Sequence, residues 1–492
     1  MGFSTLDAAI VLVYLVGVAI FGILSGGKQS SARDYFLGGK NIPWWAVCFA
    51  IVATETSTLT FISIPGVAYA SNLNFLQITF GYVVGRIVIA LLFLPAYEKG
   101  EITTAYAYLT SRFGGKTRNA ASSTFMVTRL LADGVRLYAT AIPIKLITGI
   151  DYSTAIVITA LVTLLYTYIG GVRSVIWMDV VQMFIYLGGA VAAVSVLSSQ
   201  IPGGIEGIFR NETLAEKLNV FRSGFDLSFS SFFSTPYTLA ASVLGGAFLS
   251  MASHGTDQLI VQRLLTAPTL KDRQRAIIAS GFIVMLQFAL FLLIGLLLFL
   301  FFRGEKIDPN EVFPLYIIHN MPSGISGFIV AGLLAAAMST LAGSMNALAS
   351  ATMFDIVKPL LRNELDERQE LRLSRFFTFV WCALLLASAF VFMNTTKTVV
   401  ELALGIASFT YGGLLGTFLL GVLFQRTRQS HALIGFFVGV LAMIGVVKFT
   451  SIAWTWYTVI GSSVTVLVGI AASFFHPAAR SDVSLPKKDL AS

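Results

Sequence analysis

Long runs of apolar residues constrain this chain more than any other feature of its sequence. The hydrocarbon core of a bilayer is about 30 Å thick, and a helix needs about 20 residues to cross it. Thirteen such runs occur, and 12% of the 492 residues are charged, about half the share of a soluble globular protein. We therefore predict an all-helical membrane protein, with spans near 5–26, 42–71, 75–98, 119–147, 153–170, 174–199, 228–253, 275–302, 323–354, 374–393, 399–424, 431–449 and 454–475.

The distribution of basic residues predicts how these spans are oriented. If the N-terminus is outside, 22 of the 33 lysines and arginines fall on the inner side, eight on the outer side and three within spans. Inner loops of membrane proteins carry the excess of basic residues, so this asymmetry favours an outer N-terminus and a cytoplasmic C-terminus. It also accounts for the net charge of +8 without a nucleic-acid partner. We expect a multi-pass protein of the plasma (inner) membrane.

The second span does not have the composition of a plain membrane helix. Between residues 53 and 66 it holds six hydroxyl side chains, one carboxylate and Pro65. Broken backbone at membrane depth is tolerated only where it lines a cavity or is buried in protein, so this stretch predicts a broken helix. Packing of small residues between helices is the alternative explanation.

The seventh span is interrupted at a corresponding position, by Pro236, Gly245, Gly246 and Ser250. Paired interruptions five spans apart predict an inverted repeat of five plus five helices; for this span, helix packing by small residues is an equally good explanation. The predicted division is a preceding span with an inner loop (1–41), the first repeat (42–199), an external loop (200–227), the second repeat (228–424), and two extra helices with a cytoplasmic tail (425–492).

The ninth span carries a second polar group of residues. Ala336, Ser339 and Thr340 are spaced i, i+3 and i+4, which puts them on one helical face. One backbone carbonyl and two hydroxyls there could meet the carbonyls that a break frees at Ala53 and Thr56. Five neutral oxygens suit a small monovalent cation that is held reversibly. Close helix packing is again the alternative.

The chain resembles the sodium:solute symporters, relatives of the sodium–sugar and sialic acid transporters. The resemblance rests on blocks such as Tyr35 to Gly39, Gly170 to Gln182 with its Trp-x-Asp-x-x-Gln pattern, Val261 to Arg263 and Ser339 to Asn346. It implies a leucine-transporter-like fold of broken helices in an inverted repeat, with one preceding helix, and alternating access driven by sodium.

The resemblance also implies site residues. The shared sodium site of the family matches Ala53, Thr56, Ala336, Ser339 and Thr340. A further sodium site in some members uses an acid, matched by Asp179, and two serines, whose positions hold Ala342 and Gly343 here. We therefore expect one sodium per cycle, with Asp179 either a ligand of a second sodium or a support for Ser339 and Thr340.

The predicted substrate cavity departs from that of sialic acid transporters. Their carboxylate-binding arginine in the fourth span is replaced by Ala132, so sialic acid is expected to be a poor substrate. Charges occur instead at Arg129, Asp133 and Arg136, on one helical face. An embedded carboxylate is costly, so Asp133 should pair with one arginine or both. Arg136 then either braces Asp133 or binds a substrate carboxylate.

Glu55 is the strongest substrate-binding candidate, because it lies in the unwound stretch among hydroxyl residues. Its alternative role is a buried pair with Arg129 or another cation. A carboxylate among hydroxyls and amides favours a sugar or sugar derivative over an organic acid. The candidate substrate-binding residues are Glu55, Ser57, Thr58, Thr60, Phe75, Gln77, Thr79, Asp133 and Arg136.

Other classes of function fit the sequence less well. An enzyme needs a nucleophile, a base and an electrophile that converge, and the four histidines are scattered at span ends. A channel would need repeated polar rings, and a sensor would normally carry a soluble signalling domain. We therefore expect a transporter with sodium, a small-molecule substrate and the lipid bilayer as its partners.

Overall fold

Helices make up the fold of the chain. The computed structural model describes residues 3–98, 100, 102–210, 214–361, 365–393 and 399–475, and no strand occurs among them. The α-helices are α1 (Thr5–Ser25), α2 (Ala32–Leu37), α3 (Trp44–Glu55), α4 (Thr58–Ala70), α5 (Gln77–Val88), α6 (Leu94–Glu98), α7 (Ala105–Phe113), α8 (Gly115–Thr148), α9 (Tyr152–Gln200), α10 (Gly204–Arg210), α11 (Phe229–Ser234), α12 (Leu239–Ser250), α13 (Gln258–Leu265), α14 (Leu270–Phe301), α15 (Val312–Asn320), α16 (Ile325–Ala351), α17 (Lys358–Leu360), α18 (Glu367–Phe392), α19 (Val399–Leu423), α20 (Gln429–Phe449) and α21 (Tyr457–Phe475).

Short turns of other helix types join some of these elements. Three are π-helical, η3 (Ile89–Phe93), η5 (Met251–Thr256) and η6 (Thr352–Val357), and each continues a preceding α-helix. Three are 3₁₀ turns, η1 (Gly38–Lys40), η2 (Asn74–Leu76) and η7 (Trp454–Trp456). A π-turn inserts a residue into the helix and often occurs at functional sites.

Nine helical segments in the described ranges are long and apolar enough to cross a bilayer, or ten if α2, η1 and α3 count as one bent span. The other predicted spans have recognisable counterparts. The span at 42–71 is divided into α3 and α4, and the span at 119–147 is α8. Helix α9 is 49 residues long and is interrupted at Gly171 by non-helical backbone, where the sequence predicts two spans. The count of thirteen stays a prediction.

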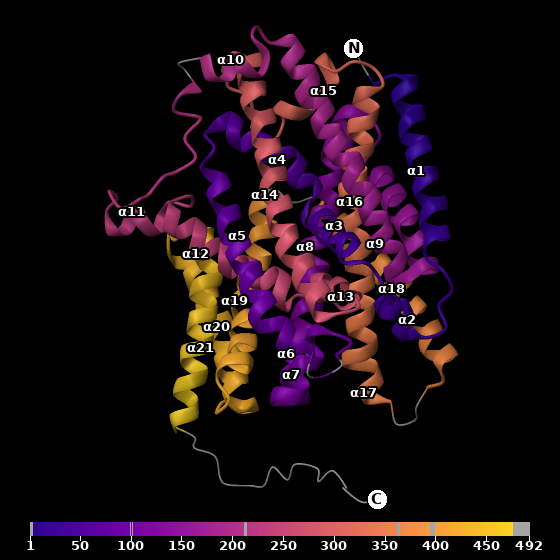
Figure 1. Ribbon diagram of the computed structural model, residues 1–492, viewed down its shortest axis with the longest axis vertical. Coiled ribbons are helices and arrows are strands. Elements are labelled where there is room, and N and C mark those ends of the chain that lie inside the picture. The colour runs from indigo at the N-terminus through magenta and orange to yellow at the C-terminus, as the bar shows by residue number, and fades with distance from the viewer. Residues whose placement is uncertain are drawn as a thin grey trace, which may run out of the picture.

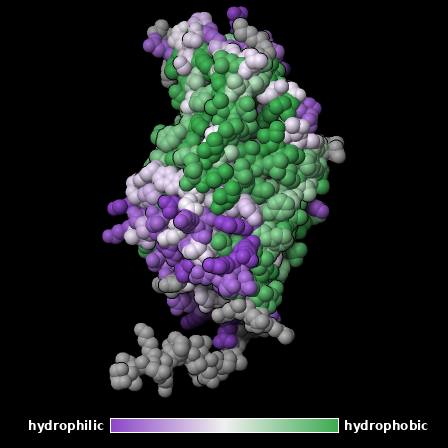
Figure 2. Space-filling model, turned by 90° about the vertical axis from the view of Figure 1, so that its right-hand side faces the viewer, coloured by the Kyte–Doolittle hydropathy of each residue, from purple (hydrophilic) through white to green (hydrophobic). Residues whose placement is uncertain are grey.

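The helices stand side by side, with the start of α1 at one end of the bundle and the end of α21 at the other (Figure 1). Helix α1 lies at one edge, and α20 and α21 lie at the opposite edge. The face that includes α1 is apolar over much of its height and hydrophilic toward the end of the bundle at which α21 ends (Figure 2). Leu12, Val13 and Leu24 of α1 are 62 to 75% exposed on the protein. An exposed apolar surface of this kind matches lipid as its solvent.

Helix α16 is the most deeply buried long helix. In its most apolar stretch 89% of the residues are buried, against 17% in α1. Ala, Gly and Ser dominate its sequence, and small side chains let neighbouring backbones approach closely. Because the helix is enclosed on all sides, its polar side chains must find partners inside the protein. Ser339, Thr340 and Ser344 therefore point to a site within the bundle.

The seventh predicted span is interrupted at one of the expected residues, Pro236, which lies in the non-helical stretch 235–238 between α11 and α12. It is not interrupted at the expected glycines. Gly245 and Gly246 lie inside α12, where added Cβ atoms would come within 2.2 Å of the Thr455 carbonyl oxygen and 2.5 Å of the Ile78 carbonyl oxygen. These glycines thus allow close helix packing, which is the alternative explanation for them. The helical path ends instead at Asp257, whose backbone is extended (φ −88°, ψ 126°).

Candidate functional site

The break in the second predicted span lies between α3 and α4. Thr56 and Ser57 have extended backbones, with φ −80° and ψ 109° at Thr56 and φ −101° and ψ 167° at Ser57. The Ser57 hydroxyl accepts a hydrogen bond from the Thr60 amide and so caps the start of α4. The last carbonyls of a helix have no partner within it, so the end of α3 offers free carbonyl oxygens inside the protein.

Helix α16 crosses this break and carries Ser339 and Thr340, the two hydroxyl residues predicted to bind a cation. The Thr340 hydroxyl oxygen lies 3.4 Å from the Thr54 carbonyl oxygen and 3.2 Å from the Ala336 carbonyl oxygen. All five candidate cation ligands are buried, and Thr340 is the most exposed at 5%. The hydroxyl of Thr56 already accepts a hydrogen bond from Gln287 at 2.6 Å. Neutral oxygens therefore gather at the break, with Thr56 able to contribute its carbonyl.

Asp179 holds Ser339 and is itself held by an arginine. The Ser339 hydroxyl donates to one carboxylate oxygen of Asp179 at 2.6 Å, and Arg263 donates Nε and Nη2 to the other at 3.1 and 2.8 Å. Asp179 and Arg263 are at most 1% exposed, so each charge needs the other. A Cβ atom on Gly343 would lie 2.6 Å from Nη2 of Arg263, so this glycine leaves room for the guanidinium.

Glu55 is part of a buried cluster of charged groups. Its carboxylate forms an ion pair with Arg86 and lies 3.4 Å from Nε2 of His254. Arg86 also donates to the Ser280 hydroxyl at 2.6 Å. The alternative considered for Glu55, a buried pair with a cation, is thus what occurs, and the cation is Arg86 rather than Arg129. His254 is 4% exposed, so it lies inside the protein although it falls at the end of a predicted span.

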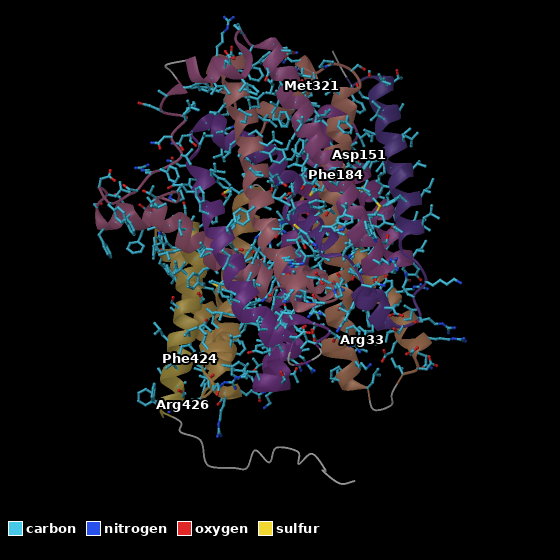
Figure 3. The ribbon with its side chains drawn as sticks, viewed as in Figure 1. Arg33, Asp151, Phe184, Met321, Phe424 and Arg426 are labelled. Atoms are coloured by element: carbon cyan, nitrogen blue, oxygen red, sulfur yellow. The ribbon has the colours of Figure 1, made fainter. Side chains whose placement is uncertain are left out.

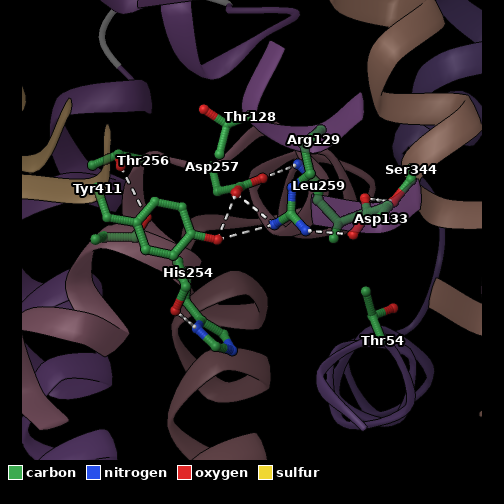
Figure 4. Close-up of polar contacts among 12 residues, drawn as sticks. Thr54, Thr128, Arg129, Asp133, His254, Thr256, Asp257, Leu259, Ser344 and Tyr411 are labelled. Carbon is green, nitrogen blue, oxygen red and sulfur yellow. Dashed lines mark hydrogen bonds and ion pairs between the residues drawn. The ribbon is translucent and has the colours of Figure 1, made fainter. Parts of the chain in front are cut away.

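The three charged residues of α8 form the predicted ion pairs with one another, here called the brace, and one of them also pairs with a residue outside α8. Asp133 accepts from Nη1 of Arg136 at 3.0 Å and lies 3.5 Å from Nη1 of Arg129, so it pairs with both arginines. Arg129 donates further to Asp257, at the break after α12, with a separation of 2.5 Å (Figure 4). The Ser344 hydroxyl of α16 donates to the other Asp133 oxygen. The brace therefore joins α8 to α16 and to the start of α13.

A small pocket opens between α4, α8 and α16. Four of the predicted substrate-binding residues, Ser57, Thr58, Asp133 and Arg136, line it together with Thr140 and Thr340. Its volume is about 20 Å³, which is room for roughly one water molecule. The Arg136 side chain is 32% exposed, whereas Asp133 is 2% exposed. The pocket is rich in hydroxyls and has one accessible guanidinium.

Phe75 and Gln77 contact the segment of the chain between α10 and α12. The Gln77 amide donates to the Tyr237 carbonyl at 2.9 Å and accepts from the Arg222 backbone amide. The ring of Phe75 packs against the ring of Tyr237, with 5.4 Å between centroids. Neither residue lines the pocket beside Ser57.

Two predicted substrate-binding hydroxyls have local partners. Thr60 belongs to the capping box of α4 with Ser57. The Thr79 hydroxyl donates to the Leu76 carbonyl at 2.7 Å, and Thr79 is fully buried. These bonds explain both side chains without a ligand.

Comparison with known proteins identifies the family of the chain. The family model of the sodium:solute symporter family matches residues 35–439. The sodium/sialic acid symporter SiaT of Proteus mirabilis is 28% identical over 97% of this chain and 96% of that protein, and the sodium/sialic acid symporter NanT of Aliivibrio fischeri is 28% identical over 98% and 95%. A solved structure of a Na+-coupled sialic acid symporter in a substrate-bound outward-open state matches with a TM-score of 0.89 at 27% identity, covering 97% of this chain and 99% of that one. The chain therefore belongs to the sodium:solute symporter family and is a sodium-coupled symporter.

Proposed function

We propose that this protein carries a small polar organic solute, preferably a sugar or sugar derivative, into the cell together with sodium by alternating access. The observation that carries the proposal is the position of Thr340. Its hydroxyl meets a carbonyl at the end of α3, and the same residue lines the hydroxyl-rich pocket. An ion and a solute that share a residue can each favour the binding of the other.

Sodium, in this proposal, is bound by the carbonyls of Ala53, Thr56 and Ala336 and the hydroxyls of Ser339 and Thr340. Such neutral oxygens attract a monovalent cation without holding it too tightly for release. Asp179 has one oxygen bonded to Ser339 and the other to Arg263, which supports a role beside the site rather than as a sodium ligand. One sodium per cycle follows from that role.

The solute is proposed to bind in the pocket through the hydroxyls of Ser57, Thr58 and Thr140, beside the Arg136–Asp133 pair. Hydroxyl side chains exchange hydrogen bonds readily with the hydroxyls of a sugar. The pocket as it stands is far smaller than a sugar, so the helices around it must separate to admit one. Glu55 is withdrawn from the set of solute ligands, because Arg86 and His254 already hold its carboxylate.

An organic acid is the second candidate solute, and the exposed fraction of Arg136 favours it. Sialic acid transporters have an arginine at the position of Ala132, and Arg136 lies one helical turn further along the same face of α8. We keep the sugar class as the first choice because Asp133, at 3.0 Å, already neutralises Arg136. Sialic acid should accordingly be a weaker substrate than a neutral sugar.

Replacing Arg136 tests this choice. We expect Arg136→Gln to change the uptake of a neutral sugar by less than about threefold, because Asp133 keeps its bonds to Arg129 and Ser344. An ionic hydrogen bond is worth about 1.5–3 kcal/mol, so the loss of a solute carboxylate's partner would instead weaken binding by roughly 10- to 150-fold. Arg136→Lys is the control that keeps the charge. Loss of transport of an acidic solute in Arg136→Gln would establish the second candidate.

Uptake into proteoliposomes tests the function as a whole. An inward sodium gradient should drive accumulation of the correct sugar at least tenfold faster than an equal potassium gradient. The solutes to screen are neutral sugars, amino sugars, sialic acid and monocarboxylates. Uptake that is equal in potassium, or that collapses only when a proton gradient is removed, would contradict sodium symport.

The topology that we propose for transport has thirteen spans, with the N-terminus outside and the C-terminus in the cytoplasm. Residues 42–199 and 228–424 form the two inverted repeats, preceded by 1–41, joined by the external loop 200–227 and followed by 425–492. The start of α1 and the end of α21 lie at opposite ends of the bundle, which supports an odd number of spans (Figure 1). The two helix breaks, after Glu55 and at Asp257, each fall near the start of their repeat.

A further inference from the structure

A wide cavity lies at the end of the bundle where α19 meets α20 and α21 ends. Its volume is about 1380 Å³, and it is enclosed by the turn between α19 and α20, the last turns of α21 and the end of α7. Figure 3 places Phe424 and Arg426 at this end of the molecule. No step of the proposed transport function uses this cavity.

The cavity is located at the level of the lipid headgroups. Two candidate membrane spans, Gln429–Phe449 and Trp454–Phe475, are 21 and 22 residues long. At about 1.5 Å per residue they match the hydrocarbon thickness, so their ends mark the bilayer surface. The cavity is lined by the start of one span, at Gln429, and by the end of the other, at Ile470 and Phe474.

The lining combines arginines with apolar side chains. Arg112, Arg426 and Arg428 contribute positive charge, and none of the described lining residues is acidic. Leu423 and Phe474 are 51% and 69% exposed, so apolar surface continues from the cavity wall to the outside of the helices.

The three arginines have different roles. Arg112 donates to the carbonyls of Gly421, Phe424 and Thr427 and so caps the end of α19. Arg426 and Arg428 are exposed, and within the described part of the chain no Asp or Glu forms an ion pair with either. Two guanidinium groups are therefore accessible at the cavity, beside one that is fixed.

We propose that this cavity binds an anionic phospholipid. Arg426 and Arg428 bind the phosphate of the headgroup, and the acyl chains lie along Leu423, Ile470 and Phe474. Guanidinium groups match phosphate oxygens in geometry and charge. A soluble anion would use the arginines alone, whereas a phospholipid also covers the exposed apolar wall. Basic pockets between membrane helices near the headgroups are sites of this kind.

Lipid binding to the purified full chain tests the proposal. The protein in a neutral detergent is titrated with phosphatidylglycerol, with phosphatidylcholine, and with inorganic phosphate, and binding is followed by native mass spectrometry and thermal shift. We expect phosphatidylglycerol to bind at least tenfold more tightly than phosphatidylcholine, and inorganic phosphate to give no shift. Raising the salt concentration should weaken the binding of phosphatidylglycerol.

The Arg426→Gln, Arg428→Gln variant should bind phosphatidylglycerol roughly 30-fold more weakly, since each arginine near an anionic lipid surface contributes about 1 kcal/mol, or about fivefold. The matched control is Arg368→Gln, Arg372→Gln, which removes two exposed arginines of α18 and should leave binding unchanged. Equal binding of both lipids, an equal shift with inorganic phosphate, or equal loss in both double variants would each overturn the proposal.

Discussion

Glutamine in place of Arg263 is expected to destabilise the protein by roughly 3–5 kcal/mol, because it leaves the Asp179 carboxylate buried without a cation. Asp179 is fully buried, and Arg263 supplies two of its hydrogen bonds. The measurement is the thermal unfolding of the detergent-purified protein. Lys358→Gln is the matched control, since the Lys358 side chain is 54% exposed and its pair with Glu370 should be worth less than about 1 kcal/mol.

The double variant Arg263→Gln, Asp179→Asn separates two roles of Asp179. It buries no charge, so most of the lost stability should return. The asparagine side chain still offers an oxygen to the Ser339 hydroxyl, so the sodium affinity should stay within about threefold of the original. If Asp179 binds a second sodium directly, the double variant will instead lose sodium affinity by tenfold or more, and its sodium dependence will become less steep.

The break at Thr56 and the polar face of α16 could be predicted because both signals are local. Hydroxyls and a proline in an apolar run are visible within one turn or two of the same helix. The pairing of Asp133 was predictable for the same reason, since both arginine partners lie within four residues of it. Burial of a charge in a membrane protein leaves few alternatives to such a neighbour.

The remaining partners come from helices far apart in the sequence, and no local pattern indicates them. Glu55 pairs with Arg86 and His254, and Asp179 pairs with Arg263, 84 residues away. The sequence places His254 near the end of a span, where a side chain is usually exposed. In the structure His254 lies in η5 and is buried in the bundle.

The seventh span is interrupted at Pro236, as predicted, but its glycines are misassigned for a related reason. A pair of glycines such as Gly245 and Gly246 can either interrupt a helix or allow two helices to pack closely, and the sequence is the same in both cases. Only the position of the neighbouring backbone shows which of the two occurs. Asp257 caps α13 through the Leu259 amide and receives Arg129 from α8. A sequence signal for it existed, an aspartate in an otherwise uncharged segment, but its arginine lies 128 residues away.

Alanine in place of Thr340 should lower sodium affinity by roughly tenfold, about 1.4 kcal/mol, with a similar loss for Ser339→Ala. Each change removes one hydroxyl ligand and leaves the helix backbone of α16 intact. Thr340 also lines the solute pocket, so Thr340→Ala should weaken solute binding at saturating sodium, whereas Ser339→Ala should not. Isothermal titration with sodium, then with solute, measures both effects.

Ser350→Ala is the control on the same helix, because the Ser350 hydroxyl contacts Gln258 rather than the break between α3 and α4. Unchanged sodium affinity in the Ser339, Thr340 double variant would show that the cation binds elsewhere, whereas equal solute binding in the two single variants would show that Thr340 does not couple the ion to the solute.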